Sequence, residues 1–170
     1  MNKGFVKIAA AIPELKVADC AFNVEKIVEL LQRAEQEKVQ VVCFPELSVT
    51  AYTCADLFFQ EKLLLDAEKR LTELQLATFS LTAVTVVGMP LRVDNQLFNV
   101  AVVLQGGRIL GVVPKTNLPN NNEFYEKRWF ASAKSTDVTT VKIGGEEVPF
   151  GTDILFTDRK FSFAIELCED

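Results

Sequence analysis

Three side chains of complementary chemistry follow apolar stretches of this sequence: Glu46, Lys115 and Cys168. The chain contains no histidine, which excludes Ser-His-Asp and Cys-His catalysis and histidine-ligated metal sites within it. A carboxylate and an ammonium can replace the imidazole, because the carboxylate takes the thiol proton while the ammonium stabilises the thiolate and then an oxyanion. The sulfur then attacks a carbonyl or nitrile carbon, so the three residues together predict acyl transfer.

Each of the three residues also has an ordinary structural explanation. Glu46 could cap a following segment, Lys115 could be a solvated loop charge, and Cys168 could be a small core residue. These explanations weaken if the fold brings the three side chains to one place. The strands that precede them therefore decide between the two interpretations.

The strands expected before the three residues predict a common site. Residues 39–44 form a nearly continuous apolar run, which is typical of a strand covered on both faces. Residues 161–167 are apolar and aromatic and predict a buried strand, and residues 108–113 predict the returning strand of a hairpin. Groups just past the carboxyl ends of strands line the ligand crevice of open α/β sheets. We therefore expect a carboxylate, an ammonium and a thiol at one rim.

The remaining pattern predicts an α/β fold with a mixed sheet. Amphipathic periodicity predicts helices over residues 19–37 and 56–79, and a buried strand over 84–88 is expected to end at Met89-Pro90. Residues 116–135 form a loop that is too long for a mere connection, so we expect it to build a binding surface. The other expected strands are residues 5–12, 97–105, 138–143, 148–150 and 154–156, with two-residue turns at Gly106-Gly107 and Gly144-Gly145.

Composition limits the classes of partner. The 170 residues are 49% hydrophobic and 24% charged, with a net charge of -5 and no Lys/Arg cluster, so we expect one globular domain, no nucleic acid and no membrane. The opening Met1-Asn2-Lys3-Gly4 shows no signal peptide, and we expect a cytoplasmic location. Four scattered cysteines form no C-x-x-C pair, so neither a disulfide framework nor a metal site is expected.

Three motifs carry a family resemblance in the correct order. They are FPELSVTAY at 44–52, PKTNLP at 114–119 and IELCED at 165–170, which resemble the Glu, Lys and Cys motifs of the nitrilase (carbon–nitrogen hydrolase) superfamily. Within it, YTCADLF at 52–58 and NEFYEKRWF at 122–130 resemble the glutaminase domain of the glutamine-dependent NAD synthetases. The resemblance covers essentially the whole chain and implies an α-β-β-α sandwich with a mixed sheet.

The resemblance also implies roles for individual residues. Glu46 would be the general base, Lys115 would stabilise the tetrahedral intermediate, and Cys168 would form a γ-glutamyl thioester from glutamine and release ammonia. No cofactor is implied in this chain. In such enzymes a synthetase domain of the same polypeptide uses ATP and Mg²⁺ to amidate nicotinic acid adenine dinucleotide with that ammonia. Residues matching positions near the glutamine site are Glu126, Glu123, Phe124, Asn121 and Glu169.

The sequence departs from the family pattern in extent and at two positions. The chain ends two residues after Cys168, whereas the family's domain continues through further strands and helices, so residues 1–170 are expected to be the N-terminal, C-terminally truncated part of the sandwich. We expect such a piece to have little or no glutaminase activity alone and to self-associate as a homo-oligomer through its exposed apolar face. Ala51 stands where glycine is common, and Asn121 stands where an aromatic residue is common.

Two alternatives to the glutaminase hypothesis stay open at this point. One is another nitrilase-type amidase or carbamoylase, which shares the three catalytic residues but lacks a ligase domain. The other is a non-catalytic interaction fragment. The sequence after Asp170 separates the glutaminase hypothesis from the other nitrilase-type amidases. Alkylation of Cys168 with and without glutamine tests the non-catalytic interpretation.

Overall fold

The fold is organised around one five-stranded mixed sheet. The computed structural model describes residues 4–158 and 161–170. The first three residues of the opening stretch, in which we expect no signal peptide, lie outside the described residues. Strands β1, β2 and β3 are parallel neighbours, whereas β4 runs antiparallel to both β3 and β5. The predicted α/β class with a mixed sheet is confirmed. The strands are β1 (Ile8–Ala10), β2 (Val41–Cys43), β3 (Val84–Val93), β4 (Gln96–Gln105) and β5 (Arg108–Pro114).

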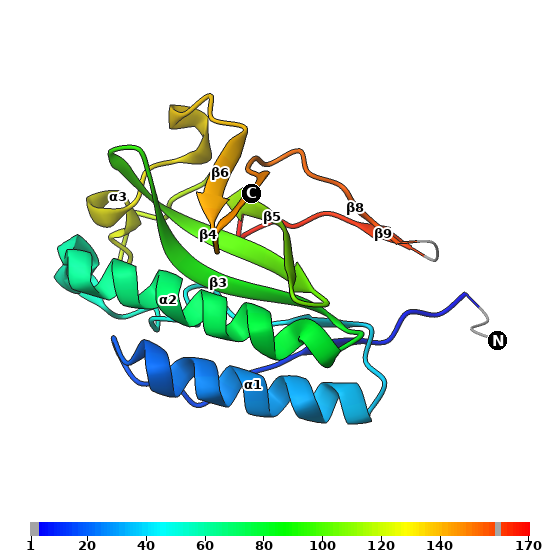
Figure 1. Ribbon diagram of the computed structural model, residues 1–170. Coiled ribbons are helices and arrows are strands. Elements are labelled where there is room, and N and C mark those ends of the chain that lie inside the picture. The colour runs from blue at the N-terminus through cyan, green and yellow to red at the C-terminus, as the bar shows by residue number, and fades with distance from the viewer. Residues whose placement is uncertain (1–3, 159–160) are drawn as a thin grey trace.

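Two helices, α1 (Cys20–Gln36) and α2 (Glu61–Ala77), lie side by side and cover one face of the sheet (Figure 1). The side chain of Asp19 starts α1 by accepting a hydrogen bond from the backbone N–H of Phe22 at 3.1 Å. Among the described residues, no helix is long and apolar enough to cross a membrane. The buried positions of α1 recur at helical spacing and include Val24, Ile27, Leu31 and Ala34.

The single helix expected over residues 56–79 is wrong, because the structure divides it into three segments. Gln60 interrupts the helix with an extended backbone, at φ −85° and ψ 117°. The interruption lets the buried ring of Phe58 pack against Trp129 and Phe130, with centroid distances of 5.9 and 5.0 Å. Long-range aromatic packing has therefore overridden the local helical periodicity. The segments are the 3-10 helix η1 (Ala55–Phe59), α2, and the 3-10 helix η2 (Thr78–Ser80).

The prediction that Met89-Pro90 ends its strand is also wrong, because β3 continues to Val93. Pro90 lies opposite Asn99 of β4, and the backbone carbonyl of Asn99 accepts from Lys115 on the other side of β4. The pair of Pro90 and Asn99 is therefore a non-hydrogen-bonded pair, in which the proline nitrogen faces away from β4. The pairing of β2 with β3 stops at Val86, so at Pro90 that side of β3 has no paired strand. Proline is tolerated there because no ladder hydrogen bond is lost.

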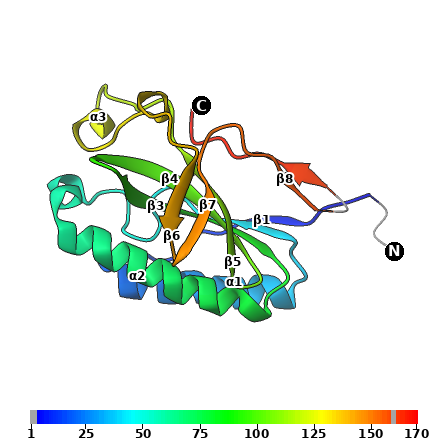
Figure 2. The same ribbon diagram turned by 45° about the horizontal axis from the view of Figure 1, so that its top comes forward.

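Two short hairpins complete the described chain. The hairpin of β6 (Thr140–Ile143) and β7 (Glu146–Pro149) lies beside β5 (Figure 2), with the turn glycines Gly144 and Gly145 both at positive φ, as a tight hairpin turn requires. The buried strand expected over residues 161–167 is wrong for most of its length. It pairs with β8 (Phe156–Thr157) only through β9 (Ser162–Phe163). The segment beyond β9 has no regular structure and packs Ile165 and Leu167 against the second face of the sheet.

Candidate active site

The edge of the sheet at the carboxyl ends of β2 and β5 carries two of the predicted site residues. Because β5 and β3 both run antiparallel to β4, β5 points in the same direction as β3 and its parallel neighbour β2. Glu46 comes shortly after β2, and Lys115 comes directly after β5. The topology therefore delivers both side chains to the same edge, although 69 positions separate them in the sequence.

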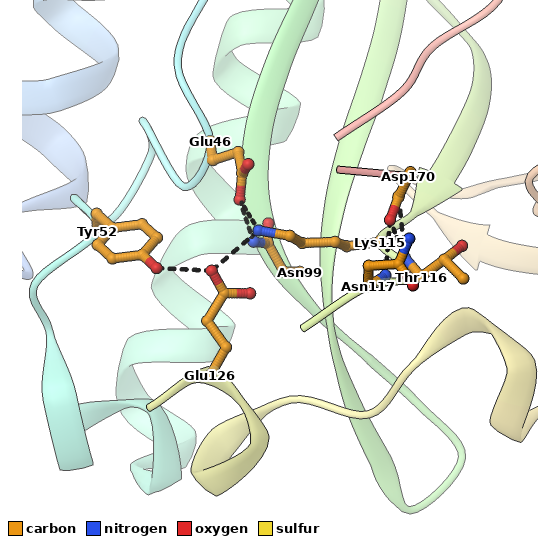
Figure 3. A network of polar contacts seen from close by, with 8 residues as sticks. All are labelled: Glu46, Tyr52, Asn99, Lys115, Thr116, Asn117, Glu126 and Asp170. Carbon is orange, nitrogen blue, oxygen red and sulfur yellow. Dashed lines mark hydrogen bonds and ion pairs between the residues drawn. The ribbon is translucent and has the colours of Figure 1, made fainter. Parts of the chain in front are cut away.

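Lys115 lies between two carboxylates. Its Nζ donates to Glu46 Oε2 at 2.8 Å and to Glu126 Oε1 at 2.9 Å (Figure 3). Lys115 and Glu126 are each 1% exposed, whereas the Glu46 side chain is 24% exposed and faces the open side of the site. Burial lowers the pKa of Lys115, but the hydrogen bonds and charges of the two carboxylates outweigh burial and raise that pKa above its ordinary value. Lys115 is therefore a fixed ammonium.

Two further residues complete this network, and neither was among the predicted site residues. Asn99 Nδ2 donates to Glu46 Oε2 at 2.7 Å, and the Tyr52 hydroxyl donates to Glu126 Oε1 at 2.6 Å (Figure 3). Burial, the hydrogen bond to Glu126 and nearby negative charges raise the pKa of Tyr52, so the phenol keeps its proton and stays a donor. A sequence signal for Asn99 existed, namely a carboxamide inside an otherwise apolar strand.

Cys168 lies at the surface beside this network. The chain on both sides of it is anchored, since Leu167 is buried and the Asp170 carboxylate accepts from the backbone N–H groups of Thr116 and Asn117 (Figure 3). Because Thr116 directly follows Lys115, the contact between Thr116 and Asp170 holds the segment that bears Cys168 beside the network. Cys168 has φ 59°, a left-handed conformation that is uncommon for residues other than glycine and concentrates at functional sites.

The structure does not bring every predicted residue into contact. Within the described chain, the Cys168 sulfur makes no hydrogen bond to Glu46 or Lys115. Phe124 packs edge-on against Tyr52 with a centroid distance of 6.5 Å, whereas Glu123 is exposed.

Asn121 and Glu169 line a hollow of about 450 Å³ beside the segment that follows Lys115. Lys127 and Lys134 also line this hollow. Among the described residues, no group of three or more Cys, Asp or Glu side chains could hold a metal ion.

The loop that carries Glu46 passes unusually close to the sheet. A Cβ on Gly88 would lie 2.4 Å from the backbone nitrogen of Leu47 and 2.7 Å from the Cα of Glu46, so only glycine fits beneath this loop. Ala51 has φ 68°, the left-handed region that glycine adopts without cost. Alanine is therefore strained at this position, where the family resemblance implies glycine.

Comparison with known families places the chain in one of them. The carbon–nitrogen hydrolase signature matches residues 7–170, and the chain belongs to that family. Its sequence is 37% identical over 170 residues to the glutamine-dependent NAD(+) synthetase of Mycobacterium tuberculosis, and 34% identical over 172 residues to that of Mycobacterium leprae. These alignments cover 98% and 99% of the chain but 25% of each relative, so the chain spans about a quarter of the length of these relatives.

Solved structures show the same fold. A glutamine-dependent NAD(+) synthetase from Cytophaga hutchinsonii superposes with a TM-score of 0.89 at 27% identity, over 97% of this chain and 28% of that one. The NitN amidase from Nesterenkonia sp. AN1 superposes with a TM-score of 0.72 at 16% identity, over 97% of this chain and 58% of the amidase. The second likeness concerns the fold alone.

Proposed function

We propose that this chain is the glutaminase part of a glutamine-dependent NAD synthetase and hydrolyses the side-chain amide of glutamine to glutamate and ammonia. The observation that carries the proposal is the buried ammonium of Lys115, held between Glu46 and Glu126 at the sheet edge and beside the segment that bears Cys168. This arrangement supplies a base, an oxyanion-stabilising cation and a nucleophile without histidine. The family match and the NAD synthetase relatives support the same substrate class.

In the first half of the reaction, Glu46 accepts the proton of the Cys168 thiol while the sulfur attacks the amide carbon of glutamine. The carbonyl electron pair moves onto oxygen, and the Lys115 ammonium stabilises the resulting oxyanion. When the intermediate collapses, the carbon–nitrogen bond breaks and Glu46 returns the proton to the departing nitrogen. Ammonia leaves, and a γ-glutamyl thioester remains on Cys168.

In the second half, Glu46 accepts a proton from a water molecule that attacks the thioester carbon. Lys115 stabilises the second oxyanion, the carbon–sulfur bond breaks, and the proton returns to the Cys168 sulfur. Glutamate leaves and the enzyme is regenerated. In this scheme, Glu126 keeps Lys115 in place, and the loop that bears Glu123 and Phe124 contacts the substrate together with Asn121 and Glu169.

We further propose that the ammonia serves a synthetase domain of the same polypeptide, since the relatives are about four times longer than the aligned segment. That domain would use ATP and Mg²⁺, and no residue of the described chain is assigned to either. A cytoplasmic location and self-association as a homo-oligomer belong to this proposal. We call this chain together with that domain the complete polypeptide.

A glutamine analogue that captures thiols tests the proposal directly. The chain and the complete polypeptide are treated with a diazoketone analogue of glutamine, and the modified peptide is identified by mass spectrometry. We expect modification of Cys168 that excess glutamine suppresses and that Cys168→Ser abolishes. Protection by acetamide in place of glutamine would instead indicate a small-amide hydrolase. Glutamate release by a complete polypeptide carrying Cys168→Ser, at the unmodified rate, would refute the mechanism.

A further inference from the structure

We propose that Asn99 is a positioning residue that occupies one oxygen of Glu46 and thereby selects the other oxygen, Oε1, as the base of the reaction. The inference rests on the proposed function for the identity of the base. It goes further by assigning the proton to one atom and by giving a role to a residue within β4. Asn99 itself contacts neither the sulfur nor the reacting amide in this scheme.

The geometry around Glu46 distinguishes its two carboxylate oxygens. Oε2 accepts from Asn99 Nδ2 at 2.7 Å and from Lys115 Nζ at 2.8 Å (Figure 3). Among the described residues, none donates a hydrogen bond to Oε1. A proton arriving at Oε2 would have to displace one of two charge-assisted hydrogen bonds, whereas a proton arriving at Oε1 displaces none. Oε1 is therefore the oxygen that can receive the thiol proton.

Asn99 also holds the second catalytic group through its backbone. Its carbonyl accepts from the backbone N–H of Lys115 at 2.9 Å, at the point where β5 ends. One residue of a central strand thus fixes the carboxylate by its side chain and the start of the lysine segment by its main chain. Because β4 is paired on both sides, this anchor lies on one of the most rigid elements of the sheet.

A role in packing alone does not account for the buried side chain of Asn99, because burying its amide oxygen without a partner is unfavourable. It is 0% exposed, and its Oδ1 has no hydrogen-bond partner among the described residues. A leucine of similar shape would avoid burying an unpaired oxygen, and burying one is unfavourable. The orientation that leaves Oδ1 unpaired is the one that points the amide donor at Glu46. The contact with the base therefore accounts for a polar group that the core does not need.

Two substitutions at Asn99 test the inference, and two matching substitutions at Gln75 serve as controls. Asn99→Leu removes the donor, and Asn99→Asp replaces it with an acceptor of the same shape. Gln75 provides the control, because it is also a buried carboxamide with an unpaired oxygen, donates to the Gly107 carbonyl at 3.0 Å and lies on α2. Gln75→Leu and Gln75→Glu therefore reproduce the loss of stability that comes from replacing a buried carboxamide, without changing a contact of Glu46.

Steady-state kinetics of glutamate release by the complete polypeptide give the first readout. We expect Asn99→Leu to lower kcat about 100-fold, the lower end of the effect of general-base catalysis, while KM for glutamine changes less than about threefold. Asn99→Asp should regain activity as the pH falls, because the protonated acid again donates a hydrogen bond, whereas Asn99→Leu should show no such recovery. Equal kcat losses in the Asn99 and Gln75 variants would overturn the inference.

A second readout does not depend on activity. In the proton–nitrogen NMR spectrum of the chain, the side-chain amide of Asn99 should shift when Glu46→Gln removes the charge from its acceptor. It should stay in place in the control Glu25→Gln, which removes an exposed carboxylate of α1. An Asn99 signal that is insensitive to Glu46→Gln would overturn the positioning contact. An unmodified polypeptide that releases no glutamate, but whose Asn99 amide responds to Glu46→Gln, would refute the proposed function and leave the contact standing.

Discussion

Replacing Lys115 by methionine removes the ammonium that separates two carboxylates. Both carboxylates bond to the same nitrogen, at 2.8 Å for Glu46 and 2.9 Å for Glu126. Methionine keeps much of the volume of the lysine stem, so the packing around the side chain is largely retained. The variant therefore isolates the electrostatic consequence of losing the cation. We expect it to be strongly destabilised at pH 8 and to recover as the pH falls.

The size of the effect follows from the geometry of the pair. Two unit charges about 5 Å apart repel by about 3 kcal/mol at an effective dielectric constant of about 20. Breaking a buried ion pair by removing one partner costs about 3–5 kcal/mol, which agrees with this figure. The repulsion makes the native state bind a proton more tightly than the unfolded chain does. Stability of the variant therefore rises as the pH is lowered, because the native state then holds more protons than the unfolded state.

Urea unfolding of the chain at pH 8 and at pH 5 measures this effect, with the exposed Lys134→Met as control. We expect Lys115→Met to lose about 3 kcal/mol at pH 8 and much less at pH 5, while Lys134→Met changes little at either pH. Adding Glu126→Gln to Lys115→Met should abolish most of the pH dependence. A destabilisation of Lys115→Met that is the same at both pH values would refute the electrostatic reasoning.

Three further predictions follow from single contacts. Gly88→Ala should lower the free energy of unfolding by about 2 kcal/mol or more, because its Cβ would lie 2.4 Å from backbone nitrogen; an unchanged urea midpoint would contradict the close approach. Hydrogen bonds from Arg128 hold the pKa of Asp56 below its usual range. The contact between Asp56 and Arg128 therefore stabilises the folded state above the ordinary carboxyl pKa, and this contribution is lost in acid. Asp56→Asn should therefore match the unmodified protein at acid pH and melt earlier at neutral pH. Burial raises the pKa of Cys20 to about 12. Iodoacetamide at pH 8 should therefore modify Cys168 much faster than Cys20, as measured by peptide mapping. Equal rates at the two cysteines would argue against the burial of Cys20.

The sequence by itself determined the class of fold and the edge at which the site is built. Apolar runs of strand length alternating with amphipathic helices indicated a mixed α/β sheet, because side-chain periodicity records which face of an element is buried. Glu46 and Lys115 follow β2 and β5, and the parallel direction of these strands brings the two residues to one edge. The three motifs likewise indicate the carbon–nitrogen hydrolase family from sequence alone.

Only the tertiary structure decided which polar groups meet at that edge. Glu126 lies in a stretch that the sequence suggests is loop, yet it is buried against Tyr52, 74 positions away, and Asn99 reaches Glu46 across 53 positions. The break at Gln60 and the passage of β3 through Pro90 also depend on neighbours distant in the sequence. The physical reason is that local periodicity encodes burial but not the partner of a buried polar group, which is fixed only when distant strands and loops pack together.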